Sequence, residues 1–133
     1  PSPPPLMDVG DGSVTLTCES TIDASLTGTC VFEFVSLNPA NLHTLTLRFT
    51  SGQFNPNEEE GLTSIQANGV SLGDCVYAVA SKGSVLGEHV CLSAFPVDDL
   101  ISARSLTINV QHNVYSGLFA TARIDTIPKP PPP

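Results

Sequence analysis

Proline constrains this chain most, because four of its 12 prolines lie in residues 1–5 and five lie in residues 128–133. Proline fixes φ near −65° and has no N–H to donate, so a run of prolines joins neither a helix interior nor a sheet. Such runs adopt polyproline II, which rises about 3 Å per residue and leaves its carbonyls open to solvent. We therefore expect two stiff linkers, residues 1–7 and 128–133, on either side of one folded domain, residues 8–127.

Between these tails, apolar and polar residues alternate with the period of β-strands. In residues 43–50, Leu45, Leu47 and Phe49 point to one side, and the threonines and arginine between them point to the other. The dense apolar stretch 29–37 predicts a central strand buried on both faces. Residues 97–104 predict a helical turn capped by Asp98 or Asp99. In all, we expect strands at residues 13–18, 29–37, 43–50, 69–72, 75–80, 88–95, 105–112 and 117–127.

Seven or eight short strands, separated by turn sequences such as Asn68-Gly69 and Ser116-Gly117, predict an all-β domain. The expected architecture is an antiparallel β-sandwich with Greek-key, immunoglobulin-like topology, flanked by the polyproline II tails. The tryptophan that marks antibody domains is missing. A length of 133 residues is enough for one domain with a proper core. Because the chain does not begin with Met, we expect a processed protein or a segment of a longer one.

Four cysteines, Cys18, Cys30, Cys75 and Cys91, allow three disulfide pairings. None of them shows the Cys-x-x-Cys spacing of zinc or redox sites. We expect Cys18–Cys30 and Cys75–Cys91, because each pair ends or begins neighbouring predicted strands. Each bond would close a short loop, which is worth about 3 kcal/mol. Two disulfides predict an oxidising compartment; the alternative is four buried thiols in a cytosolic protein.

The charge balance excludes two classes of partner. The net charge is −8 and only five residues are basic, whereas binding to phosphate backbones requires clustered Lys and Arg. Anionic membrane surfaces are disfavoured for the same reason, and no apolar run approaches the roughly 20 residues of a transmembrane helix. We therefore expect no nucleic-acid partner and no membrane insertion.

Residues that often carry catalysis are present, but not in catalytic patterns. His43, His89 and His112 lie in or beside predicted strands, and no Gly-x-Ser-x-Gly elbow accompanies them. We interpret them as structural histidines. The acidic runs 58–60 and 98–99 predict solvated loops rather than a catalytic carboxylate pair. The sequence therefore predicts no enzyme activity and no cofactor.

Two kinds of ligand stay open. Hard oxygen ligands in residues 55–60, and Asp8 with Asp11, allow a bound calcium ion, although neither run has EF-hand spacing and no metal is assigned. Sugar binding on a β-sandwich usually needs exposed aromatic rings. The available rings are Tyr77, Tyr115 and six phenylalanines, most of which lie on apolar faces. Tyr115, beside the Ser116-Gly117 turn, is the candidate ligand-binding residue.

The tails carry a family resemblance. Ser2-Pro3-Pro4-Pro5 resembles the Ser-Pro-Pro-Pro unit of hydroxyproline-rich glycoproteins, the extensins of plant walls and the pherophorin-like matrix proteins of green algae. Pro128-Lys129-Pro130, with the prolines that follow, is similar to the Lys-interrupted proline runs of the same group. The resemblance covers the tails alone. It implies O-glycosylated hydroxyproline at Pro3, Pro4, Pro5, Pro130, Pro131, Pro132 and Pro133.

The same resemblance implies an extracellular location in a cell wall, matrix or surface fibre. The expected function is a non-enzymatic structural module that repeats or self-associates through its tails and its β-domain, since proline carbonyls and rings can lie along a groove of another domain. The tails would be unmodified linkers in the alternative case. The alternative function is a carbohydrate-binding or adhesive module carried on proline-rich linkers.

Overall fold

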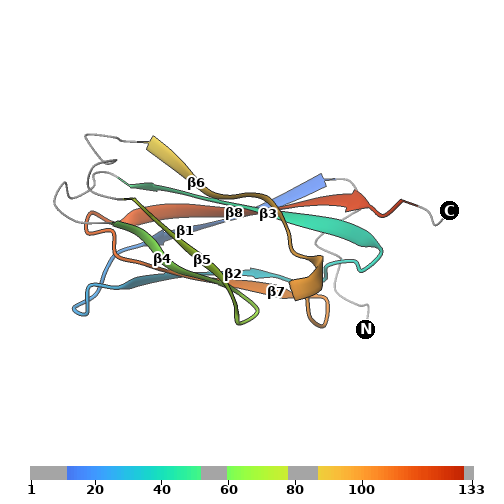
Figure 1. Ribbon diagram of the computed structural model, residues 1–133, viewed down its shortest axis with the longest axis horizontal. Coiled ribbons are helices and arrows are strands. Elements are labelled where there is room, and N and C mark those ends of the chain that lie inside the picture. The colour runs from blue at the N-terminus through green and yellow to red at the C-terminus, as the bar shows by residue number, and fades with distance from the viewer. Residues whose placement is uncertain (1–11, 52–59, 78–86, 131–133) are drawn as a thin grey trace, which may run out of the picture.

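The computed structural model describes residues 12–51, 60–77 and 87–130, which form eight antiparallel strands and one 3-10 turn. The strands make two four-stranded sheets that stack as two layers (Figure 1). The fold is therefore an all-β sandwich, as the alternating sequence predicts. The first sheet holds β1 (Gly12–Ser20), β8 (Leu118–Pro128), β3 (Asn41–Ser51) and β6 (Gly87–Pro96), in that order; the second holds β2 (Gly28–Phe34), β7 (Leu106–His112), β4 (Glu60–Ala67) and β5 (Val70–Tyr77).

The strand order is that of a jelly roll. Ladders join β1 to β8, β2 to β7, β3 to β6 and β4 to β5, which are the pairs of one long hairpin rolled on itself. Only β4 and β5 are both consecutive and paired; every other connection passes between the sheets. This order differs from the predicted immunoglobulin-like one, in which the first two strands share a sheet. Turn residues show where a chain reverses, but not whether the next strand pairs or crosses.

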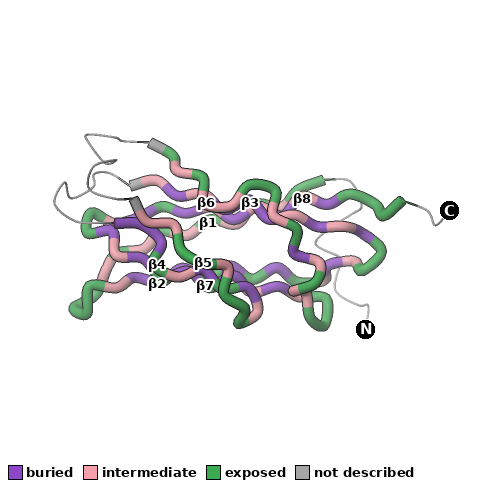
Figure 2. The backbone as a smooth tube through the Cα atoms, in the orientation of Figure 1, coloured by how far each residue is buried: buried purple, intermediate pink, exposed green. Residues whose placement is uncertain are grey.

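The core lies between the sheets and follows the period-2 pattern. Buried and exposed positions alternate along β2, β7 and β8, as the coloured tube in Figure 2 shows. The alternation predicted for residues 43–50 is confirmed, because the inward-facing residues of β3, like those of β7, are at most 1% exposed. They are Leu45, Leu47, Phe49, Leu106, Ile108 and Val110.

Three strand predictions are wrong. The strand β2 lies at a sheet edge rather than in the centre, and Val31 on its outer face is 48% exposed. The stretches 69–72 and 75–80, predicted as two strands, correspond to one strand, β5 (Val70–Tyr77), which contains Gly73 at a φ of 100°; residues 78–80 lie outside the described residues. The strand β4 was not predicted, because a bulge between Leu62 and Ile65 breaks the period-2 alternation. Its first residue, Glu60, is fully buried instead of lying in a solvated loop.

The predicted helical turn is shorter than expected and is capped differently. The 3-10 turn η1 (Asp98–Leu100) follows Val97, which occupies the N-cap position without a side-chain hydrogen bond. The carboxylate of Asp98 bonds instead to His43 at the start of β3. The Asp98 side chain, which the local sequence predicts as a helix cap, therefore binds a residue distant in sequence instead.

Both described ends of the domain lie at one end of the sandwich. Gly12, which starts β1, pairs with Thr126 near the end of β8. The strand β8 runs through Pro128, the first residue of the predicted C-terminal tail, and the Lys129 N–H donates to the Ala40 carbonyl at 3.3 Å. We call this end the base. The opposite end, which carries the β1–β2 loop (residues 21–27) and the β7–β8 loop (residues 113–117), is the tip (Figure 1).

Disulfides close both open sides of the sandwich. Cys18 on β1 is bonded to Cys30 on β2, and Cys75 on β5 is bonded to Cys91 on β6, with Cα–Cα distances of 5.9 and 5.6 Å. These are the predicted pairs. Because β1, β2, β5 and β6 are the edge strands of their sheets, each bond joins one sheet to the other along one side. Two disulfides in a small domain are typical of proteins that fold in an oxidising, secretory compartment.

Within the described ranges, no helix is long and apolar enough to cross a membrane.

Candidate functional site

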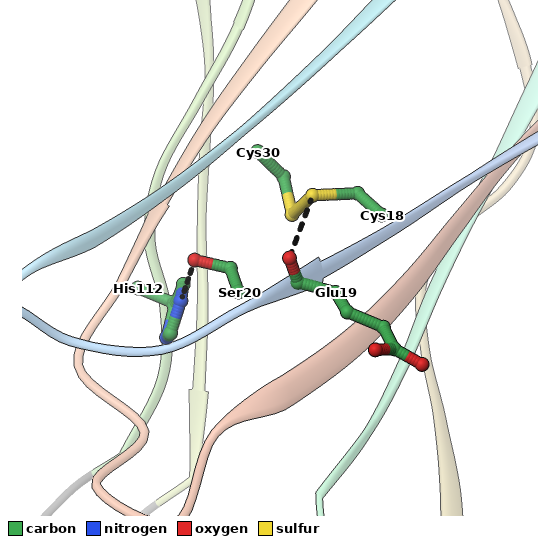
Figure 3. Close-up of a disulfide and its surroundings, with 5 residues drawn as sticks. All are labelled: Cys18, Glu19, Ser20, Cys30 and His112. Atoms are coloured by element: carbon green, nitrogen blue, oxygen red, sulfur yellow. Dashed lines mark hydrogen bonds between the residues drawn. A yellow bond between two sulfur atoms is a disulfide. The ribbon is translucent and has the colours of Figure 1, made fainter.

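A buried histidine and a serine meet at the tip. His112 ends β7, faces inward and is 0% exposed. Its Nε2 lies 2.9 Å from the Ser20 Oγ at the end of β1, beside the Cys18–Cys30 disulfide (Figure 3). The ring has room because Gly28 pairs with His112 across the β2–β7 ladder; a Cβ on Gly28 would lie 2.2 Å from Nε2. The position therefore requires glycine.

The protonation of His112 decides what this pair can do. Burial lowers the pKa of the imidazole, so the ring is neutral near pH 7. Its Nδ1 accepts the N–H of Val114 at 3.2 Å, which leaves the ring proton on Nε2. Nε2–H therefore donates to Ser20 and cannot remove the hydroxyl proton. This geometry does not make Ser20 a nucleophile.

An open depression of about 620 Å³ lies beside this pair, and we call it the tip groove. Its most prominent residue is Phe119, whose side chain stands on the outward face of β8 and is 39% exposed. Glu19 on β1 and Thr50 on β3 pair with Phe119 from its two sides. A smaller hollow of about 50 Å³ adjoins the groove and shares Thr50 and Phe119 with it. The groove is lined by Glu19, Ser20, Thr21, Thr50, Ser116, Gly117, Leu118 and Phe119.

Tyr115, the candidate ring from the sequence, is 41% exposed in the β7–β8 loop. Its neighbours Ser116 and Gly117 line the groove, whereas Tyr115 does not. Phe119 is the aromatic residue of the groove, and sequence reasoning missed it by treating phenylalanines as core residues. The alternation of β8 held the signal, because Leu118 and Ala120 face inward and so place Phe119 outward.

A second cleft lies at the base. It has a volume of about 350 Å³ and its lining includes His43, Asp98, Arg104 and Lys129. His43 is 1% exposed, and its Nδ1 lies 2.8 Å from one carboxylate oxygen of Asp98. The other oxygen accepts the His43 backbone N–H at 2.9 Å. These two contacts of the Asp98 carboxylate hold η1 against the start of β3.

The base cleft does not complete a catalytic triad. Its other lining residues are Leu37, Asn38, Pro39, Ile101 and Ala103, so no hydroxyl or thiol stands among the described side chains around His43. Ala103 and Arg104 form a tight turn with φ values of 49° and 63°. Reciprocal bonds hold this turn: the Leu37 N–H donates to the Arg104 carbonyl at 2.9 Å, and the Arg104 Nε–H donates to the Leu37 carbonyl at 3.1 Å.

Several predicted sites lie outside the described residues: Pro3, Pro4, Pro5, Pro131, Pro132, Pro133, Asp8, Asp11 and most of the 55–60 run. Pro130 is described and exposed. His89 lies on β6, where partial burial lowers its pKa, and its ring centroid is 5.1 Å from that of Phe49. Across the described ranges, no three His, Cys, Asp or Glu side chains gather as metal ligands.

Comparison with known proteins supports the fold alone. No protein-family model and no curated protein sequence matches this chain. Among solved structures, the domain is similar to part of dimeric latent PorU from Porphyromonas gingivalis, with a TM-score of 0.53 and 7% sequence identity. The match covers 90% of this chain but only 13% of the PorU chain. At this identity the likeness concerns the arrangement of strands and not the activity.

Proposed function

We propose that the chain is a non-enzymatic structural module of an extracellular proline-rich glycoprotein that repeats or assembles into a fibre, wall or matrix layer. The observation that carries this proposal is the attachment of the C-terminal proline run to the sheet. The strand β8 passes into this run at Pro128, and the main chain is still bonded to Ala40 at Lys129. From Pro128 to Pro130 every residue is exposed. A stiff spacer that starts directly at a sheet transmits orientation better than one joined through a loop.

The position of the two ends adds to this architecture. Because Gly12 and Thr126 are paired neighbours, the chain enters and leaves the domain at the base. A module of this kind hangs to one side of a proline-rich chain instead of lying in line with it. Its tip then faces away from the tails, and successive modules can pack side by side.

The disulfides suit a durable module. Each one ties an edge strand of one sheet to an edge strand of the other, so the two layers cannot separate along either side. In the chain-entropy account, loops of 12 and 16 residues are each worth about 3 kcal/mol.

The two histidine sites support a role without catalysis. His112 donates its proton to Ser20 and so cannot act as the base. His43 is bonded to Asp98, but the described lining of its cleft offers no nucleophile. Both histidines join elements of the sandwich to one another.

Mass spectrometry of the protein from its natural source tests the glycoprotein assignment. Trypsin does not cleave before proline, so after cleavage at Arg123 the C-terminal peptide 124–133 stays whole and carries Pro130 to Pro133. We expect oxidised prolines bearing pentose or hexose in this peptide. Peptide 83–104, with its isolated Pro96, is the internal control and should carry none. Bare prolines in peptide 124–133 would reject the glycoprotein assignment and favour an unmodified linker.

A further inference from the structure

Phe119 is the starting point, because its exposed ring belongs to a residue that lines both the tip groove and the smaller hollow beside it. Of the described phenylalanines only Phe119 is exposed, at 39%, although β8 has inward positions beside it. The ring is framed by Glu19 on one neighbouring strand and by Thr50 on the other. An aromatic face next to hydrogen-bonding groups matches a ligand that has an apolar face and a polar rim. Sugar rings have this form, with C–H groups on one face and hydroxyls around the edge.

Residues with hydroxyl side chains, which both donate and accept hydrogen bonds, are common in the lining of the tip groove. They are Ser20, Thr21, Thr50 and Ser116. Ser20 is already oriented, because its Oγ accepts the Nε2–H of His112 at 2.9 Å. Its side chain faces the interior with His112, whereas Phe119 faces outward, so the hydroxyl that stands beside the ring is that of Thr50, which pairs with Phe119 across the ladder.

The charges of the groove select against acidic ligands. Glu19 lines the groove, and Glu88 pairs with Thr50 on the far side of Phe119. The one described cation beside the ring, Arg48, is engaged by the Glu88 carboxylate at 2.6 Å. Carboxylates accept strong hydrogen bonds from sugar hydroxyls, but they repel uronates and sulfates. A neutral sugar is therefore the matching class.

The shape indicates more than one sugar unit. The groove of about 620 Å³ and the hollow of about 50 Å³ adjoin at Phe119 and Thr50, which line both. A chain crossing the ring would contact both. The groove lies at the tip, at the opposite end of the domain from Gly12 and Pro128.

We propose that the tip groove binds a neutral oligosaccharide chain, with one sugar ring stacked on Phe119 and its hydroxyls bonded to Thr50 and Glu19, which flank Phe119 on the two neighbouring strands. This activity goes beyond the structural role and does not depend on modification of the tails. It makes the module a cross-link between its own proline-rich chain and a neutral polysaccharide.

The test is a titration of the full chain, labelled with ¹⁵N, followed by NMR. The probes are neutral hexasaccharides of β-1,4-linked glucose, xylose and mannose and of α-1,5-linked arabinose, and the acidic control is the hexamer of galacturonate. We expect at least one neutral probe to shift the amide signals of Ser20, Thr50, Ser116 and Phe119. The acidic hexamer should leave these signals in place. Glu19→Gln should bring the affinities for neutral and acidic probes closer together, because it removes one carboxylate and keeps the shape.

Phe119→Ala should weaken binding at least about tenfold, which corresponds to about 1.4 kcal/mol. The matched control is Ile127→Ala, because Ile127 is 54% exposed on the same outward face of β8 but lies at the base. Its binding should equal that of the unmodified chain. Thermal unfolding of both variants checks that each is folded.

Three results would overturn the proposal. The first is that no neutral probe shifts the groove signals at about millimolar concentration. The second is that Phe119→Ala binds as tightly as the unmodified chain. The third is that Phe119→Ala and Ile127→Ala lose the same amount of affinity. A dimer that forms through the groove and disappears in Phe119→Ala, without sugar binding, would assign the surface to a second copy of the chain instead.

Discussion

Gly28→Ala should destabilise the domain through the buried imidazole of His112. The new Cβ would lie 2.2 Å from the His112 Nε2, 2.7 Å from its Cε1 and 2.9 Å from the Ser20 Oγ, whereas ordinary contacts begin at 3.4 Å. The ring cannot yield freely, because His112 is 0% exposed and its Nδ1 is bonded to the Val114 N–H. Either the ring or β2 must shift by about 1 Å in a close-packed interior.

The magnitude follows from two costs and one gain. Overpacking of this kind costs about 1–3 kcal/mol, and losing the His112–Ser20 hydrogen bond adds about 1 kcal/mol. Alanine also reduces the freedom of the unfolded chain, which returns up to about 1 kcal/mol. The net loss should be about 1–4 kcal/mol, with a central value of about 2.5 kcal/mol. For a chain of 133 residues this lowers the Tm by roughly 10 °C.

Urea unfolding without reductant measures this loss, with Gly12→Ala as the matched control. Gly12 also lies in a strand, but a Cβ at this position would meet no atom within 4 Å, so this change should cost less than about 0.5 kcal/mol. A second comparison uses His112→Ala, which removes the ring. Adding Gly28→Ala to that variant should cost little. If Gly28→Ala costs as much there as in the unmodified chain, or behaves like Gly12→Ala, the clash with His112 is refuted.

Two further predictions concern the two disulfides and the pH dependence of the stability. Replacing Cys18 and Cys30 by serine should lower the free energy of unfolding by about 3 kcal/mol, and replacing Cys75 and Cys91 should do the same. The two losses should add, because the bonds lie on opposite sides of the sandwich. Urea unfolding measures them. If removing one disulfide already costs as much as removing both, the two bonds do not act independently. Burial holds the pKa values of His112 and His89 below the value of about 6.5 expected in the unfolded chain. The unfolded chain therefore binds protons first, so this part of the stability is complete above about pH 6.5 and is lost as the pH falls through the lower, folded values. The urea concentration at the unfolding midpoint should therefore decrease as the pH is lowered from about 7 to about 5, and it should decrease less in His112→Ala. A midpoint that rises on acidification would contradict neutral buried histidines.

Local pattern was enough to predict the class of fold and the disulfide pairs. A strand that is buried on one face must alternate, whatever its partners are, and so Leu45, Leu47 and Phe49 were assigned to the core correctly. Cysteines at the ends of neighbouring strands have few partners within reach, which led to Cys18–Cys30 and Cys75–Cys91. Alternation failed at β4, where the bulge between Leu62 and Ile65 shifts the period by a residue.

The candidate sites depended on contacts between distant parts of the chain. Asp98 and His43 are 55 residues apart in sequence, and Ser20 and His112 are 92 apart. No local signal joins such residues, because the register and the order of the strands decide which side chains meet. The tip groove has the same origin, since Glu19, Phe119 and Thr50 come from three strands that are neighbours only in the jelly-roll order.

The amino-acid sequence by itself therefore determined the strand alternation and the cysteine pairs, since each depends on the geometry of a residue and its near neighbours. The tertiary structure alone decided the sheet order, the exit of both ends at the base and the exposure of Phe119. Those features follow from which faces the two sheets bury against each other, and burial is a property of the whole packed domain.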